Sequence, residues 1–501
     1  MHRSRLRIVD NVRFLFIGQI VSWVLGLIWV IYLPRYLGAE NMGRYAIAMA
    51  IWAVLTGIIS SGVPTYLTKE IARSPEKAAT YLGTALLQRY VIFLLCCIPV
   101  ALYSHLMGYP AEVTTLIWIV ACGVPFAHTG LIFSAVFQGL EIMQYVALVE
   151  ILAKVFLVGG SLILMAMRFG VNEIAMLAAA SGLLGVVVQL ALLRQRIPIR
   201  LTWSNALSRE MLIKSVPYAL SSLVLMLYGE TDKLIMSALV EERVVGWYGV
   251  AATLAMTFMV VPNVFATAIF PALSRDSGQK GDEAARVLRK SLDLVLIAGV
   301  PIGFGLMTVS DQVVHLLYAS KFPESAPVLR ILGATLALTF VATILGRYLL
   351  ATGRANQWTL AMFVCVVLAF PLSLALVPWA HNSFGNGAIG SALRFACTEA
   401  IMVLVGIYLL PRGLLTRANA RTALRVLAAG GVMVGTCWFV RDFFIAVPVA
   451  VGVATYAAMI LVLRVLQPED IRLFRESWQG ALASVGLRSG GRGGAGPNGT
   501  P

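Results

Sequence analysis

Ionisable side chains interrupt the long apolar stretches of this chain of 501 residues. Near the centre of a helix in a bilayer, such a residue costs about 2.5–3.5 kcal/mol, so it needs a counter-ion, a hydrated cavity or a function. Basic groups there could hold an anionic ligand, and acidic groups could couple an ion. The six basic residues are Arg89, Lys154, Lys233, Arg330, Arg347 and Arg394, and the six acidic residues are Glu150, Glu230, Asp232, Asp293, Asp311 and Glu399.

Two short clusters are the strongest candidates for such chemistry. Glu150 and Lys154 are four residues apart with the acid first, which favours an ion pair; alternatively, Lys154 lines a cavity and meets an anionic ligand. The run Glu230-Thr-Asp232-Lys233 is the densest polar cluster in any apolar stretch. Glu230 and Lys233 share a helix face, whereas Asp232 points elsewhere. This run is either hydrated at a helix end, or it contacts substrate or couples an ion.

Arg394 and Glu399 are five residues apart, which makes them poor partners for each other, so each is expected to meet another helix or a cavity. The candidate cavity cations are Arg13, Arg89, Lys154, Lys233 and Arg394, and the candidate coupling or cavity acids are Glu230, Asp232 and Glu399. A phosphate-binding GxxxxGK[ST] loop, an HExxH motif and a cysteine–histidine metal pattern are all missing from the sequence. We therefore expect no cofactor, no metal and no catalytic residue.

The elements that carry these residues must be membrane helices. Hydrophobic residues make up 59% of the chain and charged residues 13%, about half the charged share of soluble domains. Segments of about 20 apolar residues, enough to cross a bilayer, recur about 14 times. The predicted spans are 13–34, 43–66, 82–107, 113–137, 145–167, 172–193, 214–239, 246–273, 291–316, 326–350, 357–378, 387–411, 423–440 and 443–465. The predicted fold class is an all-α integral membrane protein.

Basic residues outside the spans fall almost entirely in every second loop. With the amino terminus inside, 27 basic residues lie inside and six outside, the asymmetry expected of inner loops. Both termini are therefore predicted to be cytoplasmic. The net charge of +15 is dispersed over many loops, which indicates topology and not nucleic-acid binding.

The chain also contains an internal repeat. Gly43-Arg-Tyr45-Ala-Ile-Ala48 is followed 203 positions later by Gly246-Trp-Tyr248-Gly-Val-Ala251. Six spans per copy keep both copies in one orientation, a transporter architecture with a central site. We predict a six-helix lobe at 1–210, a second at 211–411, and two extra helices at 412–466. The tail, 467–501, is rich in glycine and serine and is expected to be largely disordered and cytoplasmic.

Three sets of residues also carry a family pattern. They are Leu37-Gly-Ala-Glu-x-x-Gly43-x-Tyr45-x-x-Ala48; Gly62-Val-Pro64 followed by Glu70-Ile-Ala-Arg73; and Asp232-Lys-Leu-Ile-Met-x-x-Leu239 followed by Val245-Gly246-x-Tyr248-x-x-Ala251. Over about residues 10–465, the chain resembles bacterial polysaccharide flippases of the O-antigen and exopolysaccharide export type. These belong to the multidrug/oligosaccharidyl-lipid/polysaccharide exporter superfamily.

The resemblance implies two six-helix lobes around a V-shaped cavity. It also implies a polyprenyl-pyrophosphate-linked oligosaccharide as substrate, carried from the inner to the outer leaflet. Membrane lipids, a polysaccharide polymerase and glycosyltransferases are the other expected partners. Three alternatives stay open: another exporter of the superfamily, moving peptidoglycan precursor or drugs; a membrane polymerase or ligase; and a scaffold. Outer loops of at most about ten residues disfavour an enzyme, because a catalytic domain has no room there.

Overall fold

The structure is a computed structural model that describes residues 2–60, 62–198, 201–275 and 281–465. Side chains are described from residue 21 onward, except at 217–218, 268, 270–275 and 281–284. The predicted tail, 467–501, and the side chain of Arg13 therefore lie outside the described part. By its contacts the chain falls into two compact units, Met1–Leu415 and Thr416–Pro501.

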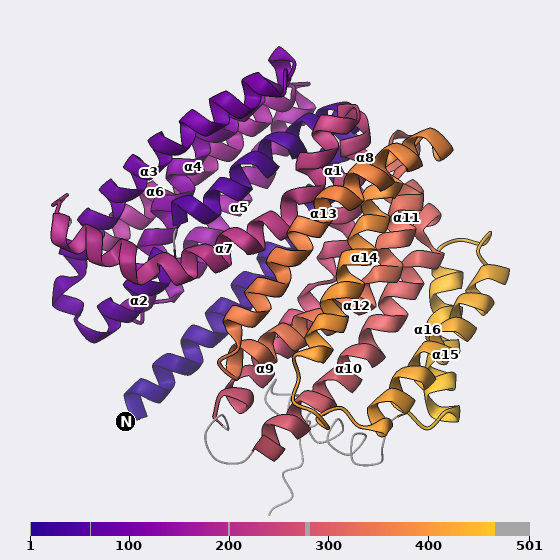
Figure 1. Ribbon diagram of the computed structural model, residues 1–501. Coiled ribbons are helices and arrows are strands. Elements are labelled where there is room, and N and C mark those ends of the chain that lie inside the picture. Colours follow the sequence, from indigo (N-terminus) through magenta and orange to yellow (C-terminus); the bar gives the residue numbers. More distant parts are fainter. Residues whose placement is uncertain (1, 61, 199–200, 276–280, 466–501) are drawn as a thin grey trace, which may run out of the picture. The chain divides into compact units, whose positions relative to one another are not determined.

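The described residues form helices joined by short turns, with no β-strand among them (Figure 1). The helices of the first unit are α1 (His2–Ser60), α2 (Val63–Arg73), α3 (Ala78–Leu106), α4 (Ala111–Gly139), α5 (Gln144–Ala166), α6 (Val171–Arg194), α7 (Asn205–Leu239), α8 (Glu242–Thr257), α9 (Val260–Arg275), α10 (Gly281–Thr308), α11 (Ser310–Tyr318), α12 (Ser325–Ala351), α13 (Ala355–Phe384) and α14 (Gly387–Tyr408). The 3₁₀ turns η1 (Pro75–Lys77) and η2 (Ala319–Lys321) complete it. The second unit contains α15 (Arg417–Phe439) and α16 (Ala446–Val462).

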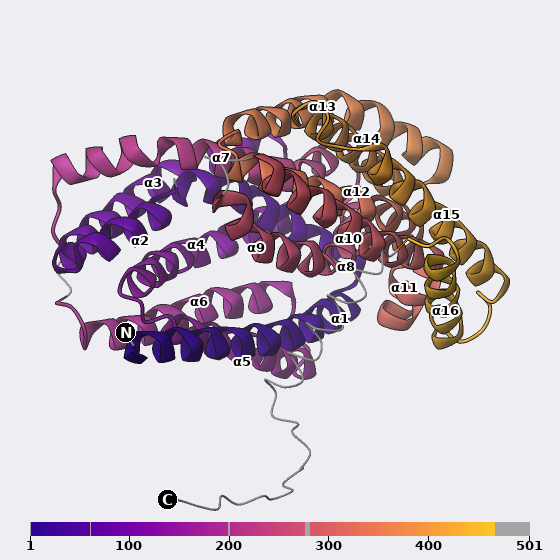
Figure 2. The same cartoon turned by 90° about the horizontal axis from the view of Figure 1, so that it is seen from below.

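Within the first unit the helices gather in two groups (Figures 1 and 2). Helices α2 to α6 form one group and α8 to α14 the other, while α1 and α7 contact members of both. In the second group α12 is central, with 67% of its most apolar window buried, against 17% for α6. The exposed residues of α6 include Met176, Leu183 and Val187, as expected for a helix facing lipid.

Helices long and apolar enough to cross a membrane number 11 in the described part of the chain, or 12 if one bent pair is a single span. The all-α membrane fold is thus confirmed, but the count of 14 is not. Helix α1 contains the predicted span 13–34 and the part of 43–66 up to Ser60, and α2 contains the end of the latter. A kink at Gly38 (φ 74°, ψ 176°), a conformation that glycine adopts most readily, separates the two spans within α1. The last predicted span, 443–465, contains the shorter helix α16.

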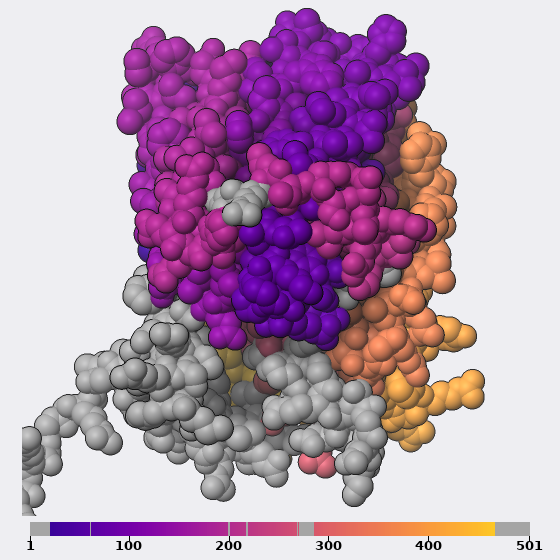
Figure 3. All heavy atoms as spheres, turned by 90° about the vertical axis from the view of Figure 1, so that its left-hand side faces the viewer, coloured from indigo at the N-terminus to yellow at the C-terminus, as the bar shows by residue number. Residues whose placement is uncertain are grey.

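Helix α7 links the two groups and is bent. Its halves, Asn205–Val216 and Ala219–Leu239, meet at 54°. Pro217 lies between them, and proline removes a backbone hydrogen bond and kinks a helix. The first half lies beside α2 on the face in Figure 3, and Gln88 of α3 donates to the Ser208 hydroxyl over 2.9 Å. The predicted lobe boundary at 210/211 falls inside this helix and stays a prediction.

The two repeat motifs meet at a backbone contact between α1 and α8. A Cβ on Gly43 would lie 1.7 Å from the carbonyl oxygen of Glu242, and a Cβ on Gly246 would lie 2.0 Å from that of Ala39. Ala39 and Glu242 are themselves 203 positions apart, the same offset as the two glycines. The contact is therefore reciprocal, as expected where two copies of one motif meet across a twofold axis.

Substituting Gly246 by Ala should destabilise the protein by about 1–3 kcal/mol, because the backbones of α1 and α8 would have to separate. The matched control is Gly249→Ala on the same helix, where the new methyl would lie 3.5 Å from the Ala46 side chain, an ordinary contact. The measurement is the thermal unfolding midpoint of each variant in detergent. Equal midpoints for both variants would show that the close approach is not needed.

Candidate functional site

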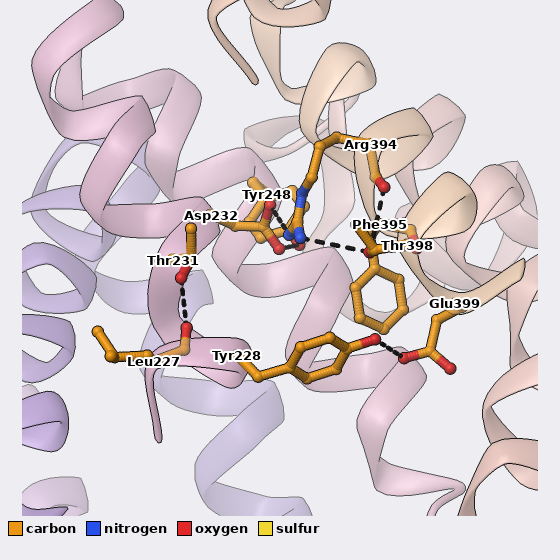
Figure 4. A network of polar contacts seen from close by, with 9 residues as sticks. All are labelled: Leu227, Tyr228, Thr231, Asp232, Tyr248, Arg394, Phe395, Thr398 and Glu399. Atoms are coloured by element: carbon orange, nitrogen blue, oxygen red, sulfur yellow. Dashed lines mark hydrogen bonds and ion pairs between the residues drawn. The ribbon is translucent and has the colours of Figure 1, made fainter. Parts of the chain in front are cut away.

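The largest buried ionic network joins α7, α8 and α14 (Figure 4). The Arg394 guanidinium forms an ion pair with the carboxylate of Asp232, and the Tyr248 hydroxyl donates to the other oxygen of that carboxylate. Asp232 is 3% exposed and Arg394 1%. Such burial is tolerated because the two charges neutralise each other and both carboxylate oxygens are in contact.

Glu399 lies on the same helix as Arg394 but has a different partner. The Tyr228 hydroxyl of α7 donates to one Glu399 oxygen over 2.6 Å. The other oxygen has no hydrogen-bond partner within the described structure, although the residue is only 3% exposed. A carboxyl group held in this way could accept a proton, since its free oxygen is otherwise unsatisfied.

Glu230 and Lys233 form a second pair on α7, separate from Asp232. Their charged atoms are 2.6 Å apart, and their side chains are 22% and 21% exposed. Both lie on one face of the helix, as their spacing predicts. Because each is partly hydrated, this pair is easier to separate than the pair between Asp232 and Arg394.

Arg89 is a buried cation of a different kind. It donates to the backbone carbonyl of Ile59 near the end of α1, where helix carbonyls lack intrahelical partners. Its Nε and Nη2 atoms have no hydrogen-bond partner among the described residues, and no acid there pairs with it. Arg89 therefore stabilises the end of α1 before α2 begins, and its charge is not neutralised by a carboxylate.

Lys154 lies between α5 and α1 and also lacks a carboxylate partner. Glu150 instead accepts a hydrogen bond from Ser22 of α1 over 3.1 Å, so the pair that spacing favours does not form. The Lys154 Nζ lies 3.7 Å from the place where a Cβ on Gly26 would be. The small residues Ser22 and Gly26 thus let α1 approach the polar face of α5, which leaves a half-buried ammonium group with no ion pair to any described residue.

The structure thus places the candidates in different surroundings. Arg89 and Lys154 belong to the first group of helices, whereas Lys233, Arg394 and the three acids lie on α7 and α14. Only Asp232 with Arg394, and Glu230 with Lys233, are brought into contact. Tyr228 and Tyr248 were not predicted from the sequence as site residues. Two features could have indicated them: Tyr228 lies four residues before Asp232, and Tyr248 lies inside the repeat motif.

A further polar contact joins α1 to α11 and η2. The Arg35 guanidinium donates to the carbonyls of Leu316 and Leu317 at the end of α11, and Lys321 donates to the Arg35 carbonyl over 2.6 Å. The Tyr318 hydroxyl donates to the Val30 carbonyl over 3.0 Å. Burial raises the pKa of Tyr318 above its usual value, which keeps this donor protonated. We call this set the α1–α11 contact.

A pocket of about 440 Å³ lies apart from all these charges. It opens among the loops around η1, between α4 and α5, and after α6. Its lining residues are Pro75, Glu76, Ala79, Leu140, Ile142, Arg196, Ile197 and Pro198. The central cavity expected between the two lobes stays a prediction.

Two relatives of this chain have names that refer to glycan biosynthesis or O-antigen transport. The chain is 24% identical over 392 residues to a probable low-salt glycan biosynthesis flippase, Agl15, of Haloferax volcanii, covering 77% of this chain and 81% of the relative. It is 21% identical to a putative O-antigen transporter of Escherichia coli (strain K12), covering 80% and 96%.

Among solved structures, the lipid II flippase MurJ in an inward closed conformation aligns with a TM-score of 0.70 at 15% identity, covering 91% of this chain and 99% of that one. An inward-facing multidrug resistance MATE family transporter aligns with a TM-score of 0.63 at 14% identity, covering 79% and 94%. At such identities these likenesses establish the fold alone, a multi-pass helical membrane fold.

Two family models match the sequence. The MatE model covers residues 217–375, and the polysaccharide biosynthesis protein model covers residues 8–276, more than half of the chain. These matches confirm the resemblance carried by the motifs of the first two spans and of the seventh and eighth. The chain belongs to the polysaccharide biosynthesis protein family.

Proposed function

We propose that this protein is a flippase that moves polyprenyl-pyrophosphate-linked oligosaccharide units across the bacterial inner membrane by alternating access. The names of its relatives, a glycan biosynthesis flippase and an O-antigen transporter, support a transporter over an enzyme. Both termini would be cytoplasmic. Glycosyltransferases would supply the lipid-linked sugar on the inner side, and a polymerase would consume it outside.

The observation that carries the proposal is the uncompensated charge of Lys154. An ammonium group in an apolar span is costly unless something neutralises or hydrates it, and no described carboxylate does. A pyrophosphate headgroup is strongly anionic and accepts charge-assisted hydrogen bonds. Lys154 would therefore contact the headgroup during transport. Arg89, which also lacks an acid partner, is the second candidate, although its contact with Ile59 already uses one donor.

Two other candidate cations with described side chains are already neutralised in this conformation. Arg394 is held by Asp232, and Lys233 by Glu230. The pair of Asp232 and Arg394 would mainly fix α7 against α14. The more hydrated pair of Glu230 and Lys233 could open and exchange partners as the substrate passes.

Alternating access requires contacts that can break at one end of the two groups. The α1–α11 contact has this character, because each of its four hydrogen bonds runs from a side chain to a backbone carbonyl, between α1 and either α11 or η2. Arg35 and Lys321 belong to the predicted outer loops. The conformation described would thus be joined at its outer end.

A drug antiporter of the same superfamily is the second candidate, because the MatE model matches residues 217–375, which include Glu230 and Asp232. The two functions predict different effects of deleting the protein. Loss of the protein would reduce surface polysaccharide in the first case and would raise sensitivity to cationic drugs in the second.

Replacing Lys154 by Gln should lower polysaccharide export at least about tenfold, since a hydrogen bond between charged groups contributes about 1.5–3 kcal/mol. Lys154→Arg keeps the charge and should retain most export. The control is Lys69→Gln, an exposed lysine at the predicted inner surface. The measurement is surface polysaccharide per membrane-inserted protein. Full export by the Gln variant would remove Lys154 from the site.

Replacing Asp232 by Asn should destabilise the protein by about 3–5 kcal/mol, because Arg394 would remain charged and unpaired in the interior. The double variant Asp232→Asn/Arg394→Gln should recover much of this loss, since neither charge remains. Thermal unfolding midpoints in detergent test both statements. A single variant as stable as the parent would mean that the ion pair does not hold α7 to α14.

Replacing Arg35 by Ala should shift the protein toward conformations open at the α11 end. The measurement is labelling of a cysteine at position 30, in a background without the native cysteines, by a membrane-impermeant thiol reagent added from outside. We expect labelling to become about tenfold faster, since two hydrogen bonds from a charged donor are lost. The control is Arg44→Ala, whose partner Glu40 lies 2.6 Å away on the same helix. Equal labelling in both variants would contradict a gating role.

A further inference from the structure

A row of arginines begins α15, the first helix of the second unit. Arg417, Arg421 and Arg425 are spaced by four residues, which places them on neighbouring turns of one helix side. All three side chains are exposed. Their guanidinium groups therefore form a line along the helix, and not a patch scattered over a loop.

Arg464, after the end of α16, lies at the same end of this unit. The Arg425 Nη1 donates to the backbone carbonyl of Arg464 over 3.3 Å, and the Arg464 side chain is exposed. Two helices thus bring four guanidinium groups to one end of the pair. We call them the arginine row.

No described acid neutralises the arginine row. Between Thr416 and Val465 the one acidic residue is Asp442, which follows α15 at its other end and lies 3.7 Å from Arg441. None of the four arginines forms an ion pair with a described residue of the chain. The described residues of the second unit therefore leave this positive charge without a counter-ion.

The same helix also carries exposed apolar side chains, which begin between Arg421 and Arg425 and continue beyond Arg425. Leu424 is 67% exposed, Leu427 44% and Val432 46%. Leu424 follows Arg421 by three residues, and Val432 follows Leu424 by eight, so these positions share one side of α15. A surface that is cationic at one end and apolar along its length matches an amphiphile with an anionic head and an acyl chain.

We infer that the arginine row binds the phosphate of an anionic phospholipid, with an acyl chain lying along Leu424 and Val432. A guanidinium group matches the geometry of phosphate oxygens, and basic residues next to a membrane helix attract anionic lipid. Orientation of the helix in the membrane requires only positive charge in the loop. The alignment of the arginines with an exposed apolar track goes beyond that requirement, and it does not depend on what the protein transports.

The test uses the full chain, purified in detergent, and phosphatidylglycerol and phosphatidylcholine with identical acyl chains. Bound lipid is counted by native mass spectrometry over a range of lipid concentrations. The variant Arg417→Gln/Arg421→Gln/Arg425→Gln should bind phosphatidylglycerol roughly 100-fold more weakly than the parent, and Arg421→Gln alone about fivefold more weakly. Binding of phosphatidylcholine should be unchanged in both.

The control variant, Lys69→Gln/Arg194→Gln/Arg209→Gln, removes the same number of exposed positive charges from other predicted inner segments. It should bind phosphatidylglycerol like the parent. An equal loss in this control would show that net charge alone attracts the lipid, and undiminished binding by the α15 variant would show that the lipid lies elsewhere. Either result would overturn the inference. Because the readout is lipid binding, a failed flippase assignment would not affect it.

Discussion

The free energy of a charge in an apolar interior constrains every polar contact in this protein. Asp232 and Arg394 are almost completely buried, and they are tolerated because they meet each other and Tyr248. Glu399 is buried against Tyr228, and Arg89 against the end of α1. Lys154 departs from this pattern, since it is half-buried and has no ion pair among the described residues. The proposed contact of Lys154 with an anionic headgroup rests on this difference.

The contact of α1 with α8 provides the frame in which these charges act. Gly43 and Gly246 let two backbones meet at a distance that a methyl group would prevent, and they do so reciprocally. Such a contact is rigid because it is made by backbone atoms. The α1–α11 contact is different in kind, because in it side chains of α1, α11 and η2 donate to backbone carbonyls. A transporter that opens and closes needs both: a close pivot, and contacts that exchange readily with water.

The two compact units show two uses of positive charge. Among the described residues of the first unit, Arg394 and Lys233 form ion pairs, Arg89 contacts a helix end, and Lys154 has no ion pair. In the second, the arginine row is exposed, lacks a described counter-ion, and leads into apolar residues. The difference follows from burial. A buried guanidinium group needs a counter-ion or hydrogen-bond acceptor within the protein. An exposed one is hydrated and can bind an external anion, as proposed for a lipid phosphate.

The sequence by itself determined the class, the membrane helices, the internal repeat and the helix face shared by Glu230 and Lys233. These features depend on composition or on neighbours within one helical turn, which spacing along the chain encodes. The number of spans stays a prediction, because length and hydropathy alone do not decide how kinked helices such as α1 and α7 divide into spans. Only the tertiary structure decided three contacts. Asp232 forms an ion pair with Arg394, 162 residues away, and Arg35 donates to carbonyls at the end of α11. Glu150 accepts a hydrogen bond from Ser22, and Lys154 has no ion pair with a described residue. Those contacts depend on which helix faces pack together, and the apolar surfaces of membrane helices are too uniform for a single sequence to specify that choice.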